Sequence, residues 1–125
     1  MMKFLLRFYL IFFLISNSAS AQHFTLSGKL SKGRGVCLDL SYFNSKGKHT
    51  HDTCTLLNGT FSFKGEIQGP QIVYLTAYKG RFKLKSDDDP NVAAFFMEPG
   101  IITTKGGKYG DLKKIKISGS KTQTE

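Results

Sequence analysis

Hydrophobic and polar residues alternate along most of the chain after residue 21, and glycines interrupt the alternation. In the segment 36–42 every second residue is apolar, namely Val36, Leu38, Leu40 and Tyr42. The segment 61–64 alternates in the same way. A period of two is typical of a β-strand that buries one face. The pattern therefore predicts strands, and no stretch after residue 21 has a convincing helical period.

Eight segments carry a strand signal, and turn signals separate them. Asn58-Gly59 is the strongest of these turns, because both residues tolerate the positive φ of a type I′ hairpin. Spacings of about 8 to 12 residues between short strands are typical of sandwiches and barrels. We expect an all-β fold, an antiparallel β-sandwich or barrel-like sheet, whose strand order the sequence does not reveal. The expected strands cover residues 24–30, 36–42, 50–57, 61–67, 72–78, 93–97, 101–104 and 112–117.

Residues 1–21 have the three parts of a cleavable signal peptide. Lys3 and Arg7 are basic, residues 8–15 are apolar, and Ala19-Ser20-Ala21 offers small side chains for cleavage. A transmembrane helix needs about 20 apolar residues, so we expect cleavage after Ala21 and no stable membrane anchor afterwards. Gln22 stands where a lipoprotein would have cysteine. We expect an exported chain, periplasmic or associated with the cell envelope, with one β domain over 22–120 and a disordered tail or the start of a linker over 121–125.

The chain is basic, with 18 Lys and Arg against 9 Asp and Glu and a formal net charge of +9. A basic balance raises the prospect of nucleic-acid binding. Export argues against it, and the lysines are scattered over turns and strand edges, where they discourage edge-to-edge pairing. We expect no nucleic-acid partner. An envelope protein is the expected partner, and the oligomeric state stays open.

Two cysteines, Cys37 and Cys54, are present. They do not form a CxxC pair, so catalytic redox use is not expected. A hairpin with its turn near residues 45–48 places them on adjacent strands, about two residues out of register. An oxidising compartment permits a disulfide, but such an offset strains its geometry. A structural disulfide and two buried free thiols both remain open.

His49 and His51 lie on one face of an expected strand, close enough to share a metal ion. A structural zinc site wants four ligands, and only His23 or Asp39 is expected to approach in the fold. Two histidines near a hairpin tip are more often solvated polar residues. We therefore predict no metal ion and no cofactor, with His49 and His51 as the weaker alternative.

No catalytic motif is present: the chain has no GxSxG, no HExxH and no glycine loop that cradles a phosphate ahead of a helix. The carboxylates of Asp39, Asp52, Glu66 and Glu98 fall on separate segments. We expect Asp52 to accept backbone N–H groups in a neighbouring turn. The sequence thus predicts a protein that is not an enzyme.

The order of several short motifs resembles the DUF4369 domain family, an exported β module of Bacteroidetes-type bacteria. The motifs are Asp52-Thr53, Asn58-Gly59-x-Phe61-x-Phe63-x-Gly65, Pro70, Phe96-Met97-Glu98-Pro99-Gly100 and Ser118-Gly119-Ser120. In that family the module usually precedes a thioredoxin-like domain of the peroxiredoxin type. The residues of that catalytic domain are not in this sequence, so the resemblance implies no redox activity here.

The resemblance implies an exported, non-catalytic accessory or interaction domain of the cell envelope. The alternative is an N-terminal fragment of a thiol-disulfide oxidoreductase whose thioredoxin-like catalytic domain is missing. A third and weaker hypothesis is a module that holds a glycan, a lipid headgroup or a metal.

Overall fold

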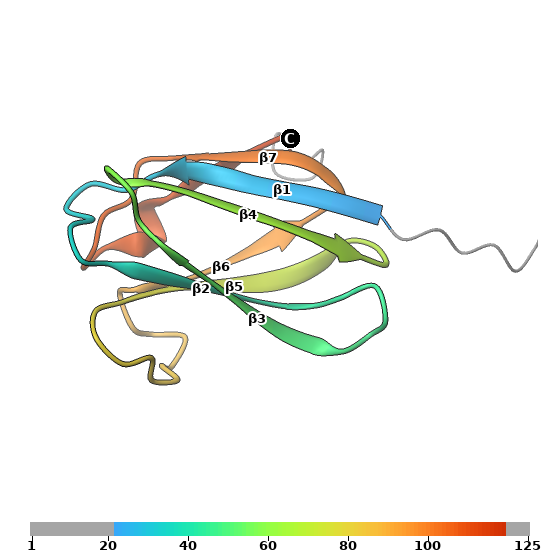
Figure 1. Cartoon of the computed structure of the whole chain (residues 1–125), viewed down its shortest axis with the longest axis horizontal. Helices are drawn as coiled ribbons and strands as arrows, with labels where there is room; N and C mark the ends of the chain where they lie inside the picture. The colour runs from blue at the N-terminus through green and yellow to red at the C-terminus, as the bar shows by residue number, and fades with distance from the viewer. Residues whose placement is uncertain (1–21, 120–125) are drawn as a thin grey trace, which may run out of the picture.

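Alternating apolar residues form the strands of a two-layer β-sandwich in the computed structural model, which describes residues 22–119 (Figure 1). One sheet has the strand order β4-β1-β7-β8 and the other has β3-β2-β5-β6. The strands are β1 (Gln22–Lys29), β2 (Cys37–Phe43), β3 (His49–Thr55), β4 (Thr60–Ile67), β5 (Gln71–Tyr78), β6 (Val92–Met97), β7 (Gly100–Lys105) and β8 (Lys116–Ser118). The all-β prediction is confirmed, and the two sheets form a sandwich and not a closed barrel. The expected signal peptide, residues 1–21, and the expected tail, residues 121–125, lie outside the described residues.

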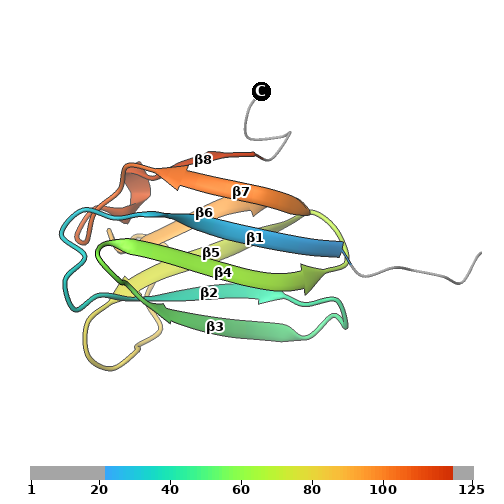
Figure 2. The same cartoon turned by 45° about the horizontal axis from the view of Figure 1, so that its top comes forward.

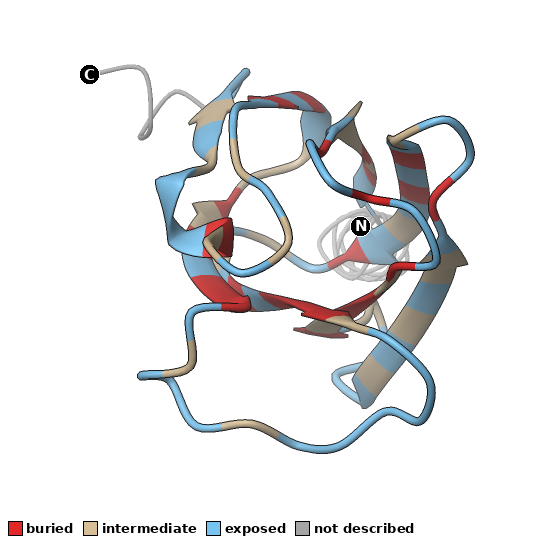
Figure 3. Ribbon diagram, turned by 90° about the vertical axis from the view of Figure 1, so that its left-hand side faces the viewer, coloured by how far each residue is buried: buried red, intermediate tan, exposed pale blue. Residues whose placement is uncertain are grey.

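The core lies between the sheets and is built from the predicted alternation. Leu38 and Leu40 of β2 are fully buried, and Phe61 and Phe63 of β4 are almost so. In Figure 3 the buried and exposed bands alternate along the strands, as a period of two requires. In β1, β2 and β4, the face that was expected to be apolar is therefore the face that packs in the core.

Two hairpins form where the turn residues predict them. Asn58 and Gly59 both adopt positive φ, 52° and 77°. Leu57 and Thr60 flank them and exchange two backbone hydrogen bonds of 3.1 and 2.9 Å. The other hairpin joins β2 to β3, where the side chain of Asn44 accepts the N–H groups of Lys46 and Lys48.

One strand pair departs from the predicted antiparallel arrangement. β1 pairs with β4 antiparallel but with β7 parallel, with Phe24 opposite Gly100. Parallel neighbours need a long connection, and here the chain between them passes through the whole second sheet (Figure 2). Alternation along one strand does not encode that route, which is why the sequence did not show it.

The last predicted strand, 112–117, is wrong in its first half. Leu112–Lys114 is a short 3-10 helix, η1, and only Lys116–Ser118 pairs with β7. Leu112 is fully buried, and its N–H donates to the carbonyl oxygen of Pro90 at 2.7 Å. The N–H of Ile115 then closes the turn on the carbonyl oxygen of Leu112. These bonds replace the ladder that a strand would make.

Candidate functional site

The two histidines of β3 lie on the outer face of the sheet β3-β2-β5-β6, away from the core. In the β2–β3 ladder His51 is opposite Ser41, and His49 is opposite Phe43. The imidazole rings of His49 and His51 stand edge to face, with centroids 4.7 Å apart. The prediction that they share one face is confirmed.

Asp39 approaches His51, as one of the two predicted candidates. Its Oδ2 lies 2.9 Å from Nδ1 of His51. Asp39 is only 2% exposed, although it belongs to an outer face. A buried carboxylate needs a hydrogen-bonding or charged partner, and His51 supplies it while keeping its own side chain 39% exposed. His23 instead lies near Glu66, on the other sheet.

The segment 79–91, between β5 and β6, folds over the outer face beside Asp39 and His51. Phe82 packs edge to face on Tyr78, with centroids 5.3 Å apart, and lies 6.0 Å from the ring of His51. The Nζ of Lys85 donates to the carbonyl oxygen of Ala77 at 3.1 Å. These contacts hold the segment over the sheet.

Between this segment and the sheet lies a cavity of about 270 Å³, which we call the histidine pocket. It combines a polar group from β2 and β3 with apolar side chains from β5, β6 and the segment 79–91. Its lining residues are Asp39, Ser41, His49, His51, Tyr74, Thr76, Phe82, Leu84, Lys85, Asp87 and Val92.

The polar group of the histidine pocket is not a catalytic triad. The hydroxyl of Ser41 is 2.6 Å from Nε2 of His49, whereas Asp39 bonds His51. A triad requires one imidazole to join the hydroxyl and the carboxylate. Here Ser41 and Asp39 are hydrogen-bonded to two different imidazoles, so the carboxylate does not orient the ring that faces the serine.

The same hydrogen bonds occupy one ring nitrogen of each histidine. Within residues 22–119, no three side chains of His, Cys, Asp or Glu gather as a metal site. Nε2 of His49 is hydrogen-bonded to the hydroxyl of Ser41, and Nδ1 of His51 is hydrogen-bonded to the carboxylate of Asp39. Each imidazole keeps its other nitrogen for a further partner, but two histidines alone fall short of the four ligands of a structural zinc site.

The two cysteines are free and lie on opposite faces of one hairpin. The ladder sets Cys37 opposite Thr55 and Cys54 opposite Leu38, so the offset is one residue and not the expected two. A shift of one residue turns a side chain to the other face of a sheet. Cys54 packs against the core, whereas Cys37 faces outward, 3.7 Å from the hydroxyl of Thr55.

Asp52 has a partner that its sequence position did not reveal. The hydroxyl of Tyr42 donates to its Oδ2 at 2.7 Å, where a backbone N–H group was expected. Tyr42 is 5% exposed. Burial raises the pKa of Tyr42 above its ordinary value of 10.0, and the hydrogen bond and charge of Asp52 raise it further. Register explains the pairing, because Tyr42 and Asp52 are diagonal neighbours on the inner face.

Burial also raises the pKa of Tyr78, which lies beside the histidine pocket. The charges of Cys37 and Asp39 act in the same direction, as does a hydrogen bond with Cys37. A phenol with a raised pKa stays neutral in ordinary solution. Tyr78 is therefore a neutral neighbour of Asp39 and not a second source of negative charge.

No helix among the described residues has the length and hydrophobicity needed to cross a bilayer. The family model described as a domain of unknown function, DUF4369, matches residues 24–125. The chain belongs to the DUF4369 family. No curated protein and no solved structure matches it.

Several DUF4369 motif residues have structural roles that do not involve the histidine pocket. Asn58 and Gly59 make the β3–β4 turn, and Asp52 holds Tyr42. A Cβ atom on Gly65 would lie 2.6 Å from the hydroxyl oxygen of Tyr42 and 2.8 Å from the ring of Phe24, which leaves no space for it. These four motif residues thus contribute to the β3–β4 turn and to the packing of the sandwich.

Proposed function

We propose that this DUF4369 chain is an exported, non-catalytic accessory domain of the bacterial cell envelope that binds a protein partner. Its binding surface is the outer face of the sheet β3-β2-β5-β6. The basic n-region, apolar run and small residues of the segment 1–21 support export. The separation of Ser41 and Asp39 onto two different histidines supports a role without catalysis.

The observation that carries the proposal is a difference between the two outer faces. Large apolar side chains stand exposed on the outer face of β3-β2-β5-β6 and on the segment that covers it; we call them the apolar outer face. Its members are Phe43, Ile72, Tyr74, Phe82 and Leu84. Exposed apolar groups that cluster in one place mark interaction sites, whereas scattered ones are ordinary.

The outer face of the other sheet has the ordinary composition of a solvated strand surface. Thr25 is opposite Lys64, and Ser27 is opposite Ser62. Ile101, on β7, is the large apolar side chain exposed there, at 74%. The two faces are made by the same alternation, so the apolar outer face is not a general consequence of the fold.

The setting of the histidine pocket, among the exposed apolar side chains of the apolar outer face, favours a protein partner. Protein interfaces often centre on one side chain seated in a pocket and surrounded by apolar contacts. We infer that an envelope protein places one apolar or aromatic side chain between Phe82 and Tyr74, beside the hydrogen-bonding group of Asp39 and His51.

Photo-crosslinking in the producing cells tests this proposal, with a crosslinking amino acid at position 72 or at position 101. Both positions are exposed isoleucines, at 53% and 74%, on opposite sheets. We expect a discrete adduct with one envelope protein from position 72 and none from position 101. Equal adducts from both positions, or none from position 72, would contradict the docking face.

Export and the absence of catalysis have separate tests. Mass spectrometry of the periplasmic fraction should find the chain beginning at Gln22.

Purified protein should not accelerate the reduction of insulin disulfides by a thiol. Reduction at a rate that falls in a Cys37→Ser variant would show that the domain is an enzyme.

A further inference from the structure

One end of the sandwich, which Figure 3 shows face-on, is made of four loops. Strand pairing sets β1, β3, β5 and β7 running toward this end, so the connections that follow these strands meet there. We call this surface the loop end; its loops are residues 30–36, 56–59, 79–91 and 106–115, the last of which contains η1. The turns of the opposite end are residues 44–48, 68–70 and 98–99.

Hydrogen bonds between neighbouring loops make the loop end one continuous surface. They join the first loop to the second and to the fourth, and the third loop to the fourth. The donor and acceptor residues are Leu30 N–H with the carbonyl oxygen of Gly59 at 2.8 Å, Tyr109 N–H with the carbonyl oxygen of Ser31 at 3.3 Å, and Gly110 N–H with Oδ1 of Asn91 at 2.6 Å.

Basic side chains gather on the loop end. Its loops carry nine lysines and arginines against four aspartates, whereas the turns of the opposite end carry two lysines and one glutamate. The lysines that look scattered along the sequence are therefore concentrated at one end of the fold. The nine basic residues are Lys32, Arg34, Lys79, Arg81, Lys83, Lys85, Lys108, Lys113 and Lys114.

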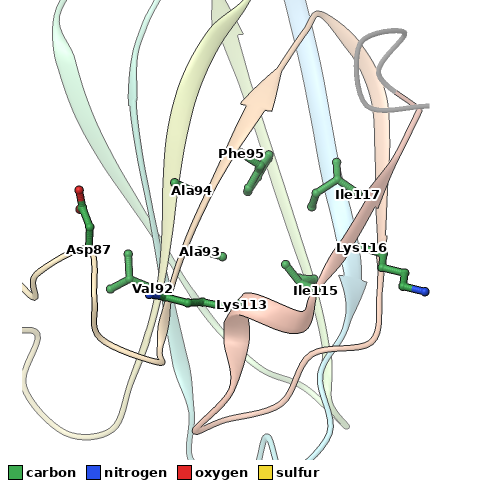
Figure 4. Close-up of a pocket in the computed structure, with 9 residues that line it drawn as sticks. All are labelled: Asp87, Val92, Ala93, Ala94, Phe95, Lys113, Ile115, Lys116 and Ile117. Carbon is green, nitrogen blue, oxygen red and sulfur yellow. The ribbon is translucent and has the colours of Figure 1, made fainter. Parts of the chain in front are cut away.

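Three of the four aspartates on the loop end are engaged within the protein. Asp111 forms an ion pair with Lys114 at 3.1 Å. Oδ1 of Asp89 accepts a backbone N–H group of its own turn at 2.8 Å. Asp87 lines the histidine pocket and a second groove, of about 700 Å³, beside β6 (Figure 4). These carboxylates therefore neutralise little of the positive charge that the loops present to solvent.

Most of the basic side chains have no partner that holds them. Among the nine, Lys114 is the one that forms an ion pair within residues 22–119. Nζ of Lys85 is hydrogen-bonded to a carbonyl oxygen, and Nζ of Lys79 lies over the ring of Tyr109, 4.7 Å from its centroid. The six that remain are exposed, and they can meet an anionic surface: Lys32, Arg34, Arg81, Lys83, Lys108 and Lys113.

Two leucines stand out among these cations. Leu57 is 73% exposed and Leu84 is 86% exposed, on two different loops of the loop end. Segments that bind at the surface of a bilayer combine apolar side chains, which enter the headgroup boundary, with lysines and arginines, which attract anionic lipids. Leu84 also belongs to the apolar outer face, so Leu57 is the leucine that tests the loop end separately.

We propose that the loop end docks on the surface of an anionic lipid bilayer. The six exposed cations meet the phosphates of the headgroups, and Leu57 and Leu84 enter the boundary between headgroups and acyl chains. A fluid bilayer accepts side chains from separate loops, whereas a protein partner needs a surface of complementary shape. Because the strands run toward the loop end, the outer face of β3-β2-β5-β6 stands away from the bilayer and stays open to a protein.

Sedimentation with vesicles tests the role of charge. The protein should begin at Gln22, because it then keeps every strand and lacks the apolar run 8–15, which would bind lipid by itself. We expect binding to vesicles of equal parts phosphatidylglycerol and phosphatidylcholine and none to phosphatidylcholine alone. The double variant Arg34→Glu with Lys108→Glu should weaken this binding by about tenfold or more, since each cation near an anionic surface adds to the attraction.

The matched control is Lys46→Glu with Lys48→Glu, which changes the net charge equally on the β2–β3 turn at the opposite end. Its binding should stay within about twofold of the unmodified protein, because charges beyond the Debye length are screened. The four substituted side chains are all exposed, so both double variants should fold.

A single tryptophan reports whether a leucine enters the bilayer, because the chain has no tryptophan of its own. In Leu57→Trp, anionic vesicles should shift the fluorescence to shorter wavelength. Ile101→Trp is the control: Ile101 is 74% exposed, as Leu57 is at 73%, but it lies near the start of β7, at the opposite end. The same vesicles should leave its fluorescence unchanged.

Four results would overturn the proposal. The first is equal binding to anionic and to phosphatidylcholine vesicles. The second is an equal loss of binding in the control double variant, which would reduce the effect to net charge. The third is an unshifted tryptophan at position 57. The fourth is binding of soluble heparin without binding of vesicles, which would assign the loop end to an acidic glycan.

Discussion

At the scale of single residues, Thr104 of β7 carries an internal polar group that the fold leaves unsatisfied. Its hydroxyl is the buried side-chain oxygen within residues 22–119 that has no hydrogen-bond partner. Thr104 is 5% exposed, and its hydroxyl points at Gly28 of β1. A Cβ atom on residue 28 would collide with it. Close packing against β1 therefore leaves this hydroxyl without a partner.

Replacing Thr104 with valine should stabilise the protein. The change Thr104→Val keeps the shape of the side chain and removes an unsatisfied hydroxyl, whose burial costs about 1–3 kcal/mol. We expect the free energy of unfolding in urea to rise by about 1 kcal/mol. Thr103→Val is the control, because the hydroxyl of Thr103 shares a 2.8 Å hydrogen bond with Ser118. Equal gains from both changes would mean that β-propensity, not the missing partner, sets the effect.

Tyr42 makes the stability of the folded protein depend on pH in the alkaline range. Its pKa is higher in the folded chain than the ordinary value of 10.0, so the folded state holds the phenolic proton more tightly. The resulting stability is complete below pH 10.0 and is lost as the pH rises through the folded pKa. Tyr42→Phe should cost about 1–2 kcal/mol near neutrality, and its stability should fall less steeply above pH 10.0.

Urea unfolding from about pH 8 to about pH 12 measures this difference. The raised pKa of Tyr78 contributes to the stability of both proteins and cancels in the comparison. Curves that stay parallel above pH 10.0 would show that Tyr42 does not titrate differently in the folded state.

At the scale of elements, alternation predicted where strands lie and which face is buried, but not their pairing. β2 shows the limit: Leu38, Leu40 and Tyr42 were placed on one face, as the structure has them. The same pattern fits a β2–β3 register shifted by one residue in β3, because both faces of β3 are largely polar. Register is fixed by the hairpin turn, and that single residue decides whether Cys37 and Cys54 share a face.

The β2–β3 register predicts which pairs of cysteines can form a disulfide. In the protein as it stands, both thiols should react with a maleimide after purification under air. In the variant Cys54→Ser with Thr55→Cys, the new thiol lies directly opposite Cys37. Opposed strand residues have Cα separations of about 4.5–5.5 Å, within the range of disulfides. We expect this variant to lose two mass units on oxidation and to react with no maleimide.

The matched control keeps Cys54 and replaces Thr53 with cysteine on a Cys37→Ser background. Cys54 and residue 53 are adjacent on one strand and point to opposite faces, so no disulfide should form. A disulfide between Cys37 and Cys54 in the unmodified protein would show that the β2–β3 register differs from the one described.

At the scale of the whole molecule, the sequence could not show which segments pack against which faces of the sheets. His49 and His51 were visible as a pair, and Asp39 was one of two candidates to join them. The position of the segment 79–91 beside them was not visible, because no local pattern shows which face of a sheet a loop will cover. The place of β6 at the end of its sheet was not visible for the same reason, because no local pattern in VAAFFM gives the strand order.

The strand order of the two sheets predicts which backbone amides exchange slowly with solvent and which exchange fast. β1, β2, β5 and β7 have a paired strand on each side, whereas β3, β4, β6 and β8 are edges. Backbone hydrogen bonds paired on both sides and buried in the core open only with global unfolding. We expect the slowest amide exchange in β2 and β5, where Leu38, Leu40, Val73 and Leu75 are fully buried.

β8 should exchange fastest of the strands, because only three residue pairs join it to β7. Native-state hydrogen exchange by NMR, followed through increasing urea, measures this order. Exchange of the β8 amides as slow as that of the β2 and β5 amides would contradict this order.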